Sequence, residues 1–159
     1  MCSSDLVQFV SKIPSATTVS SSPNPSTFGG SAAFAIAVST NDGVTATGSV
    51  SLSDGSLGLG SCTLTAGACT ITISNLSVGS HSITARFGGD LTHQPSTSAV
   101  LTQQVDRAPT TTAINSSPNP SAYGGTVTLT ATVTSGAGNP TGTVSFSDGS
   151  TPIDRKSTR

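Results

Sequence analysis

The sequence is poor in charged and aromatic residues. Only 8% of its 159 residues are charged, glutamate and tryptophan are absent, and there is a single tyrosine. Six lysines and arginines cannot form a basic footprint for nucleic acid or a polybasic patch for a membrane surface. No run of residues approaches the roughly 18–20 apolar residues of a membrane-spanning helix. The scarcity of aromatics also counts against a surface that recognises a ligand, because aromatics are enriched at such surfaces.

A segment of the chain occurs twice. The string SPNPS at residues 22–26 returns at residues 117–121, about 95 residues later. The strings TG at residues 47–48 and SDGS at residues 53–56 also return, at residues 141–142 and 147–150. A repeat of this length corresponds to one small domain, and tandem domains are typical of arrays rather than of enzymes.

The repeat predicts the domain boundaries. Lys12-Ile13-Pro14 aligns with Arg107-Ala108-Pro109. We therefore expect three parts: the last strand of a preceding repeat with its linker at residues 7–13, a complete domain at residues 14–108, and the N-terminal half of a second domain at residues 109–153. On this interpretation the natural protein extends beyond both ends of the sequence.

The two termini are expected to be foreign to the protein. Residues 1–6 and residues 154–159 can be encoded by DNA strings that are reverse complements over nearly their whole length. That DNA resembles a common sequencing-library adapter. We interpret both segments as adapter-derived scars and leave them out of the argument on fold and function. The remaining chain has three basic residues, Lys12, Arg86 and Arg107.

Hydrophobic residues alternate with small or polar ones, which is typical of strands with one buried face. Phe34, Ile36 and Val38 show this period, and the second copy keeps hydrophobic residues at the matching positions. The pattern extends to these residues: Val50, Leu52, Ile71, Ile73, Ile83, Ala85, Phe87, Ala99, Leu101, Val127, Leu129, Ala131, Val133, Val144 and Phe146.

Turn-forming residues separate these short runs, and this combination predicts a sandwich of two antiparallel sheets. Pro23 and Pro25 are expected to interrupt the first edge strand, because proline cannot donate to a ladder.

Two cysteines remain outside the terminal segments, Cys62 and Cys69, on either side of a glycine-containing turn. Opposed on a hairpin, their Cβ atoms could reach disulfide distance. The alternative is a pair of free thiols in a reducing compartment. A disulfide would indicate an oxidising location.

No arrangement of residues predicts catalysis or a cofactor, and the nucleophile motif Gly-x-Ser-x-Gly is absent. We expect His81 to be a turn or strand-edge residue and His93 to be solvated in the loop before the last strand. The aspartates lie mostly in turns, where a side chain commonly bonds its own backbone: Asp42, Asp54 and Asp148.

Two metal sites can be considered. Zinc held by Cys62, Cys69 and His81 is disfavoured, because the spacing fits no standard zinc pattern. Calcium held at a domain junction by Asp90 or Asp106 is a better candidate, but calcium needs about six or more oxygen ligands and the chain has few acids. We assign no metal site.

Three strings occur in a characteristic order: ATTV followed by PNP within residues 16–25, TGSV at residues 47–50, and GSHSITARFGGD at residues 79–90. Together they resemble the bacterial Ig-like domain repeat family, whose members occur in large secreted and cell-surface proteins. The resemblance covers residues 14–108 in full and residues 109–153 as the first three strands. It implies an all-β, Ig-like antiparallel sandwich in tandem copies, one complete and one truncated.

Many members of this family have a cysteine hairpin similar to that of Cys62 and Cys69. Phe87 departs from the family, which usually has tyrosine there, so that the contact of the tyrosine hydroxyl would be missing.

The resemblance implies a non-catalytic structural role, because family members serve mainly as spacers or adhesive modules. We predict a spacer or stalk module from a tandem Ig-like array of a larger protein, located outside the cell or on its surface. The expected partners are neighbouring Ig-like repeats of the same chain. The alternative is an adhesive module that binds a glycan or a surface protein. Neither nucleic acid nor a membrane span is expected for this fragment.

Overall fold

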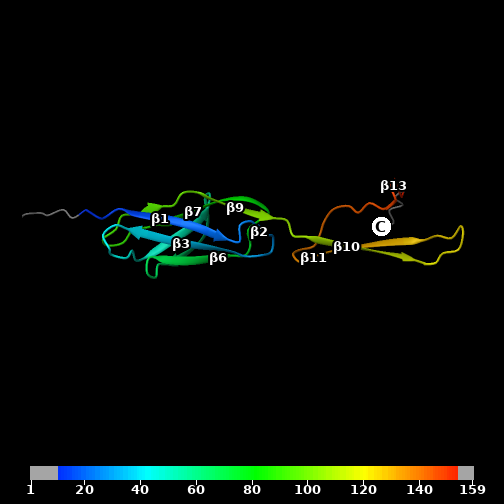
Figure 1. The fold of residues 1–159 in the computed structure, drawn as a ribbon, viewed down its shortest axis with the longest axis horizontal. Coiled ribbons are helices and arrows are strands. Elements are labelled where there is room, and N and C mark those ends of the chain that lie inside the picture. The colour runs from blue at the N-terminus through cyan, green and yellow to red at the C-terminus, as the bar shows by residue number, and fades with distance from the viewer. Residues whose placement is uncertain (1–10, 154–159) are drawn as a thin grey trace, which may run out of the picture. The chain divides into compact units, whose positions relative to one another are not determined.

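The computed structural model describes residues 11–153. The two predicted scars and most of the segment 7–13 lie outside the described residues. The described part of the chain forms strands and no helix, and it divides into two compact units with the boundary after Arg107 (Figure 1). Residues 11–153 accordingly contain no helix with the length and hydropathy that crossing a membrane requires.

The first unit is a sandwich of two sheets. Three strands form one sheet, in the order β1 (Ser15–Ser22), β3 (Ala32–Thr40) and β6 (Ala68–Ile73). The other sheet has the order β2 (Ser26–Thr27), β9 (Leu101–Asp106), β7 (Gly79–Phe87), β4 (Ser49–Asp54) and β5 (Leu57–Thr63), with β8 (Ser96–Thr97) also paired to β7. The predicted all-β sandwich is confirmed. Its strand pairs are antiparallel except for β2 and β9, which are parallel.

The first strand changes sheets where the two prolines interrupt it. β1 pairs with β3 as far as Ser22, and β2 pairs with β9 from Ser26 onwards. Pro23 and Pro25 have no N–H to donate, so the ladder to β3 cannot continue through them. The predicted interruption is therefore present. The chain keeps its direction after the break, and this is also the direction of β9, which explains the parallel pair.

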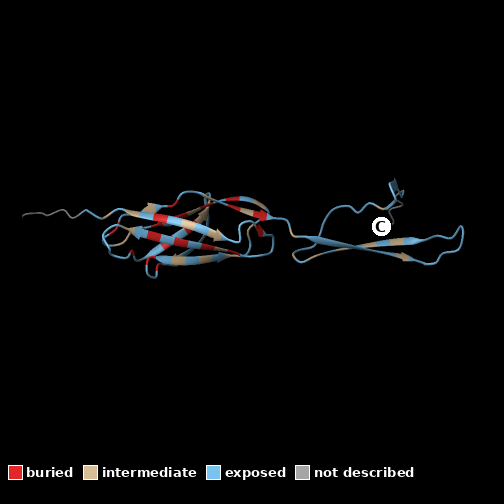
Figure 2. Cartoon of the chain, viewed as in Figure 1, coloured by how far each residue is buried: buried red, intermediate tan, exposed pale blue. Residues whose placement is uncertain are grey.

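The core lies between the facing sides of the two sheets, as the buried positions in Figure 2 show. Alternation with a period of two correctly predicts the buried side of β3, β4 and β7. In the last strand the prediction holds for Leu101, which packs partly buried against the core, but it is wrong for Ala99, which is exposed ahead of β9. Gln103, a polar residue, is buried on the same side of β9. The largest fully buried apolar side chains are Phe34, Phe87, Ile36, Leu52, Ile83, Val50 and Val105. Burial of one such side chain contributes about 1.5–3 kcal/mol.

The second unit has strands but no buried residue among those described (Figure 2). Its strand pairs are β10 (Thr110–Ser117) with β11 (Thr128–Ser135), and β12 (Ser147–Asp148) with β13 (Thr151–Pro152). The predicted alternation persists in β11, but its inward side is only half-buried.

The strand predicted through Val144 and Phe146 forms only after them, at β12. Its counterpart in the first unit, β4, lies between β5 and β7. The described part of the second unit contains no counterpart of β7, so one side of this strand has no ladder to join.

Candidate functional site

Groups that could take part in acid–base or redox chemistry form three small clusters in the first unit. Two clusters pair a histidine with aspartate, and the third is the cysteine pair. The segments by which the chain enters and leaves the unit lie beside some of these residues.

His81 lies near the start of β7, which agrees with the expectation of a residue at the edge of a strand, and its side chain is buried. Its Nδ1 atom is 2.7 Å from Oδ2 of Asp54, and its Nε2 atom is 2.9 Å from the carbonyl oxygen of Ser77. The hydrogen bonds to Asp54 and Ser77 raise the pKa of His81 above its ordinary value. Asp54 also accepts the N–H of Ser82 at 2.8 Å, so its carboxylate joins β4 to β7. We had expected this carboxylate to bond the backbone of its own turn instead.

The expectation that His93 is solvated is wrong. Its side chain is fully buried between two carboxylates. Nδ1 is 2.9 Å from both carboxylate oxygens of Asp90, and Nε2 is 3.3 Å from Oδ2 of Asp42. We call Asp42, His93 and Asp90 the His93 cluster. Because carboxylates only accept, both ring nitrogens must donate to satisfy them, and only the protonated imidazolium can do so.

The shifts of pKa agree with this geometry. The hydrogen bond to Asp90 raises the pKa of His93 above its ordinary value, although burial opposes the shift. The same bond, with the N–H of Thr47, holds the pKa of Asp90 far below its usual range. Burial opposes the shift at Asp42 too, but the N–H of Val44 and the His93 ring lower its pKa. Asp42 therefore bonds the backbone of its own turn, as expected, and also faces the ring of His93.

Asp90 fixes the loop that follows β7, residues 90–94, which we call the 90–94 loop. Its carboxylate accepts the N–H groups of Thr92 at 2.9 Å and of His93 at 2.7 Å, and that of Thr47 at 3.0 Å from outside the loop. Thr47 belongs to the Thr-Gly string that occurs in both copies, so this contact gives the recurring string a structural purpose. With its oxygens engaged in this way, Asp90 is not the free calcium ligand considered above.

In the described chain, no group of three or more His, Cys, Asp or Glu side chains is arranged to hold a metal ion. Asp106 lies at the end of β9, where its Oδ1 accepts only a long hydrogen bond of 3.5 Å from Nε2 of Gln104.

The incoming segment is hydrogen-bonded to the 90–94 loop. The N–H of Ile13 donates to the carbonyl of Thr92 at 2.8 Å, and the N–H of Gln94 donates to the carbonyl of Ile13 at 2.8 Å. The Gln94 side chain donates to the carbonyl of Lys12 at 2.9 Å, and the Lys12 ammonium donates to the carbonyl of Asp90.

The outgoing strand is held by the recurring SPNPS string. The side-chain amide of Asn24 donates to the carbonyl of Thr102 at 2.8 Å, and its oxygen accepts the N–H of Gln104 at 3.0 Å. A little further on, the N–H of Phe28 donates to the carbonyl of Asp106 at 2.8 Å. The string therefore ties the start of the domain to its last strand.

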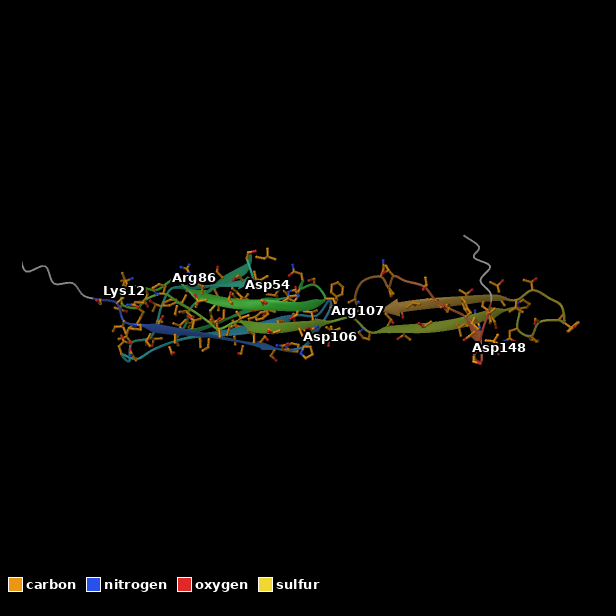
Figure 3. All side chains as sticks on the ribbon, turned by 90° about the horizontal axis from the view of Figure 1, so that it is seen from above. Lys12, Asp54, Arg86, Asp106, Arg107 and Asp148 are labelled. Atoms are coloured by element: carbon orange, nitrogen blue, oxygen red, sulfur yellow. A yellow bond between two sulfur atoms is a disulfide. The ribbon has the colours of Figure 1, made fainter. Side chains whose placement is uncertain are left out.

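The incoming and outgoing segments lie at opposite ends of the first unit, as the labels of Lys12 and Asp106 show in Figure 3. Ile13 forms a bridge to His93, beyond the end of β7, whereas Val105 pairs with Gly79 at the start of β7. A strand of nine residues rises about 3.3 Å per residue, so the two points are about 25–30 Å apart.

Cys62 and Cys69 form a disulfide. The hairpin expected around it is paired only at its turn, where Thr65 and Ala68 form an isolated antiparallel bridge, because β5 and β6 belong to different sheets. The chain crosses from one sheet to the other through a tight turn, in which Ala66 and Gly67 have positive φ angles of 53° and 76°. The disulfide therefore links the two sheets at their edges, and both sulfur atoms are engaged in it.

A shallow depression of about 460 Å³ lies on the solvent side of the three-stranded sheet. Ala35 and Ala37 of the central strand are flanked there by the hydroxyl groups of Thr18, Ser20 and Thr70. The residues that line it include no acid, no base and no aromatic ring. Apart from the disulfide-bonded Cys69, its side chains are aliphatic or carry a hydroxyl group.

The family comparison agrees with this fold. The family model described as bacterial Ig-like domain (group 3) matches residues 18–106 and 114–158, which is more than half of the chain. No curated protein matches the chain. A solved structure of Clostridium thermocellum CbhA fibronectin(III)-like modules is similar, with 22% identity, a TM-score of 0.44, and coverage of 57% of this chain and 94% of that chain. Bacterial Ig-like domains occur in surface and secreted proteins and are typically non-catalytic. This chain belongs to the bacterial Ig-like domain family, group 3.

Proposed function

We propose that the chain is part of a tandem array of Ig-like modules and acts as a non-catalytic spacer in a larger secreted or cell-surface protein. One observation carries the proposal: the incoming and outgoing segments are hydrogen-bonded to opposite ends of the first unit. A module of this geometry adds its own length to an array. A module with both connections at one end would not.

The surface of the first unit supports a passive role. Its charged side chains are few, and those labelled in Figure 3 are scattered along the unit. Both histidines are engaged with acceptors within the unit, and the shallow depression has no group that could transfer a proton. The partners proposed for the module are therefore its neighbours in the chain. The disulfide supports an oxidising location outside the cytoplasm.

Single-molecule pulling tests the spacer role. A polyprotein of identical copies of the first unit, joined through its own linker residues, is expected to unfold in evenly spaced events. Each event should lengthen the chain by on the order of 300 Å, given about 3.6 Å per residue and the segment closed by the disulfide. A featureless extension would contradict the proposal.

The alternative, an adhesive module for a glycan or a surface protein, has less support. The depression described above lacks the aromatic side chains that anchor such partners. A glycan array probed with the full chain should give no specific binding. A reproducible hit that is lost on mutation of the depression would favour the adhesive role instead.

A further inference from the structure

The 90–94 loop takes part in two sets of contacts. Towards the unit, the side chains of Asp90 and His93 bond to each other, to Asp42 and to Thr47. Towards the incoming linker, the backbone of the same loop exchanges hydrogen bonds with residues 12–13. Whatever fixes this loop therefore also fixes the linker.

The loop is tightly constrained. Gly89, immediately before it, has a φ angle of +81°, and a Cβ atom there would lie 2.9 Å from the carbonyl oxygen of His93 and 3.0 Å from the nitrogen of Pro95. Asp90 accepts two N–H groups of the loop itself. The close approach at Gly89 and the two bonds of Asp90 therefore connect the side chains of Asp90 and His93 to the loop backbone whose carbonyl groups face the linker.

Two carboxylates face His93: Asp42 comes from the turn after β3 and Asp90 from the loop itself. A third charged group, the Lys12 ammonium of the incoming linker, donates to the backbone carbonyl of Asp90. If His93 loses its proton, one buried ring nitrogen presents a lone pair to a carboxylate. At Nδ1 the nearby donor is the hydroxyl of Thr92, 3.2 Å away, which at present donates to Asp90 and would have to turn from Asp90 to the ring. Loss of the proton therefore costs the cluster a hydrogen bond and changes the contacts of the 90–94 loop.

From this arrangement we propose that the 90–94 loop is the binding site for the linker entering this module, and that the His93 cluster makes the binding depend on pH. The linker is held when His93 is protonated and released when it is not. In an array, this binding would give a junction whose stiffness varies with pH, and that consequence rests on the proposed spacer function. The binding of the linker to the loop does not depend on the spacer function.

The direction of the pH dependence follows from the three groups. The pKa of His93 is raised, so its contribution is complete below the ordinary value of 6.5 and is lost as the pH rises through the raised pKa. The pKa values of Asp42 and Asp90 are lowered, so their contributions are complete above the ordinary value of 3.8 and are lost as the pH falls through the lowered values. The linker is thus held best in mildly acidic solution and released in alkaline solution.

The complete cluster is a property of one copy. Between Asp106 and Asp148 the sequence has no acidic residue, and the turn that corresponds to that of Asp42 is built from Gly136, Ala137 and Gly138. A module that follows this second sequence lacks the carboxylate that faces Nε2. Successive junctions are therefore expected to differ in their response to pH.

Amide hydrogen exchange in the full chain tests the proposal, because Ile13 and Gln94 donate the two backbone bonds that join the linker to the loop. Protection factors, which correct for the intrinsic pH dependence of exchange, are measured by NMR from about pH 6 to about pH 9 together with the titration of both histidine rings. Protection of both amides should fall by about tenfold or more as His93 titrates, since one pKa unit of interaction corresponds to a tenfold change in population.

Two variants and a matched control sharpen the experiment. His93→Gln should leave both amides weakly protected at every pH. Asp42→Asn keeps an oxygen for the N–H of Val44 but removes the charge that faces Nε2, and should move the loss of protection to lower pH. His81→Gln removes the other buried histidine, near the opposite end of β7, and should leave the linker unchanged. Asp42→Asn carries the test if the His93 variant does not fold.

Two results would overturn the proposal: protection that stays constant while His93 titrates, or an equal effect of His81→Gln on the linker amides. The two proposals can fail separately. If protection of the linker amides follows the titration of His93, but the pulled polyprotein shows no unfolding events, the binding site for the linker stands and the spacer function is refuted.

Discussion

At the scale of single residues, the first unit places both of its histidines against carboxylates, and neither ring has a free nitrogen. Nε2 of His81 faces a backbone carbonyl rather than a hydroxyl group, so this Asp–His pair has no nucleophile to activate. The contact of His81 with Asp54 and that of His93 with Asp42 instead join segments that are 27 and 51 residues apart in the sequence. Their effect should be visible in stability.

We predict that the first unit is most stable between about pH 4 and about pH 6.5 and loses stability in alkaline solution. The pKa of both histidines is raised, so their contributions fade as the pH rises through those raised values. Urea denaturation of the full chain at several pH values measures this. The double variant His81→Gln/His93→Gln should have a flatter profile. A wild-type midpoint that does not change between mildly acidic and alkaline solution would contradict the prediction.

Gly89 allows a second prediction at this scale. Gly89→Ala should lower the free energy of unfolding by about 1–3 kcal/mol, because alanine is strained at a positive φ and its Cβ would collide with backbone atoms of the loop. Gly58→Ala is the matched control, since a Cβ there meets nothing within 4 Å. Chemical denaturation compares the two variants. Equal losses of stability would show that the close approach at Gly89 is unimportant.

At the scale of elements, the disulfide joins edge strands of different sheets and so resists their separation. Replacing both cysteines, Cys62→Ser with Cys69→Ser, should lower the free energy of unfolding by about 2–3 kcal/mol, because the loop that the bond closes is short. Denaturation of the oxidised wild type and the variant measures this difference. The wild-type protein with its disulfide reduced should have the same stability as the variant. Identical midpoints for the oxidised wild type, the reduced wild type and the variant would show that the disulfide does not stabilise the unit.

The sequence allowed the buried sides of β3, β4 and β7 to be predicted, because alternation is a local signal. It also allowed the break at Pro23 and Pro25 to be predicted. The sequence did not allow the burial of His93 to be predicted. Its partner Asp42 lies 51 residues away, and a contact between residues so far apart leaves no local pattern in the sequence. Gln103 was missed for a related reason. Its amide donates to the carbonyl of Pro23 and to the hydroxyl of Ser26, which makes a polar residue acceptable on a buried side.

The cysteine turn shows the same limit. The spacing of Cys62 and Cys69 predicted that they could lie close together. It could not predict that β5 and β6 belong to different sheets, because the sheet that a strand joins depends on strands distant in the sequence. The comparison of the two copies was more informative. It indicated which positions face a core. Because the second copy corresponds to only half a domain, it also indicated that the apolar side of β11 would lack the strands that cover its counterpart in the first unit.

At the scale of the whole molecule, the two units differ in how much they bury. The first has a closed core, whereas the second has no buried residue among those described and exposes Ile114 and Tyr123. Half a sandwich has too little covered apolar area to offset the entropy of ordering its chain. The second unit should therefore be marginal in solution.

Limited proteolysis of the full chain tests this difference. Cleavage is expected first within residues 109–153, leaving a resistant fragment that contains the first unit. Leu129→Ala, in the second unit, should not change the unfolding midpoint of that fragment, whereas Phe34→Ala at the equivalent core position should lower its stability by about 3–5 kcal/mol. Comparable resistance of both units to protease would contradict the expectation.

The opposite placement of the incoming and outgoing segments has a mechanical consequence. Tension along the polypeptide pulls Ser15 and Asp106 away from each other, parallel to the strands that they terminate. The ladder between β1 and β3 and the parallel pair of β2 with β9 are then sheared rather than peeled, so their residue pairs share the load. The bonds of Lys12 and Ile13 lie outside that ladder and yield first. In the proposed array, each module would have a soft first extension, set by the His93 cluster, in series with a stiff and brittle second one.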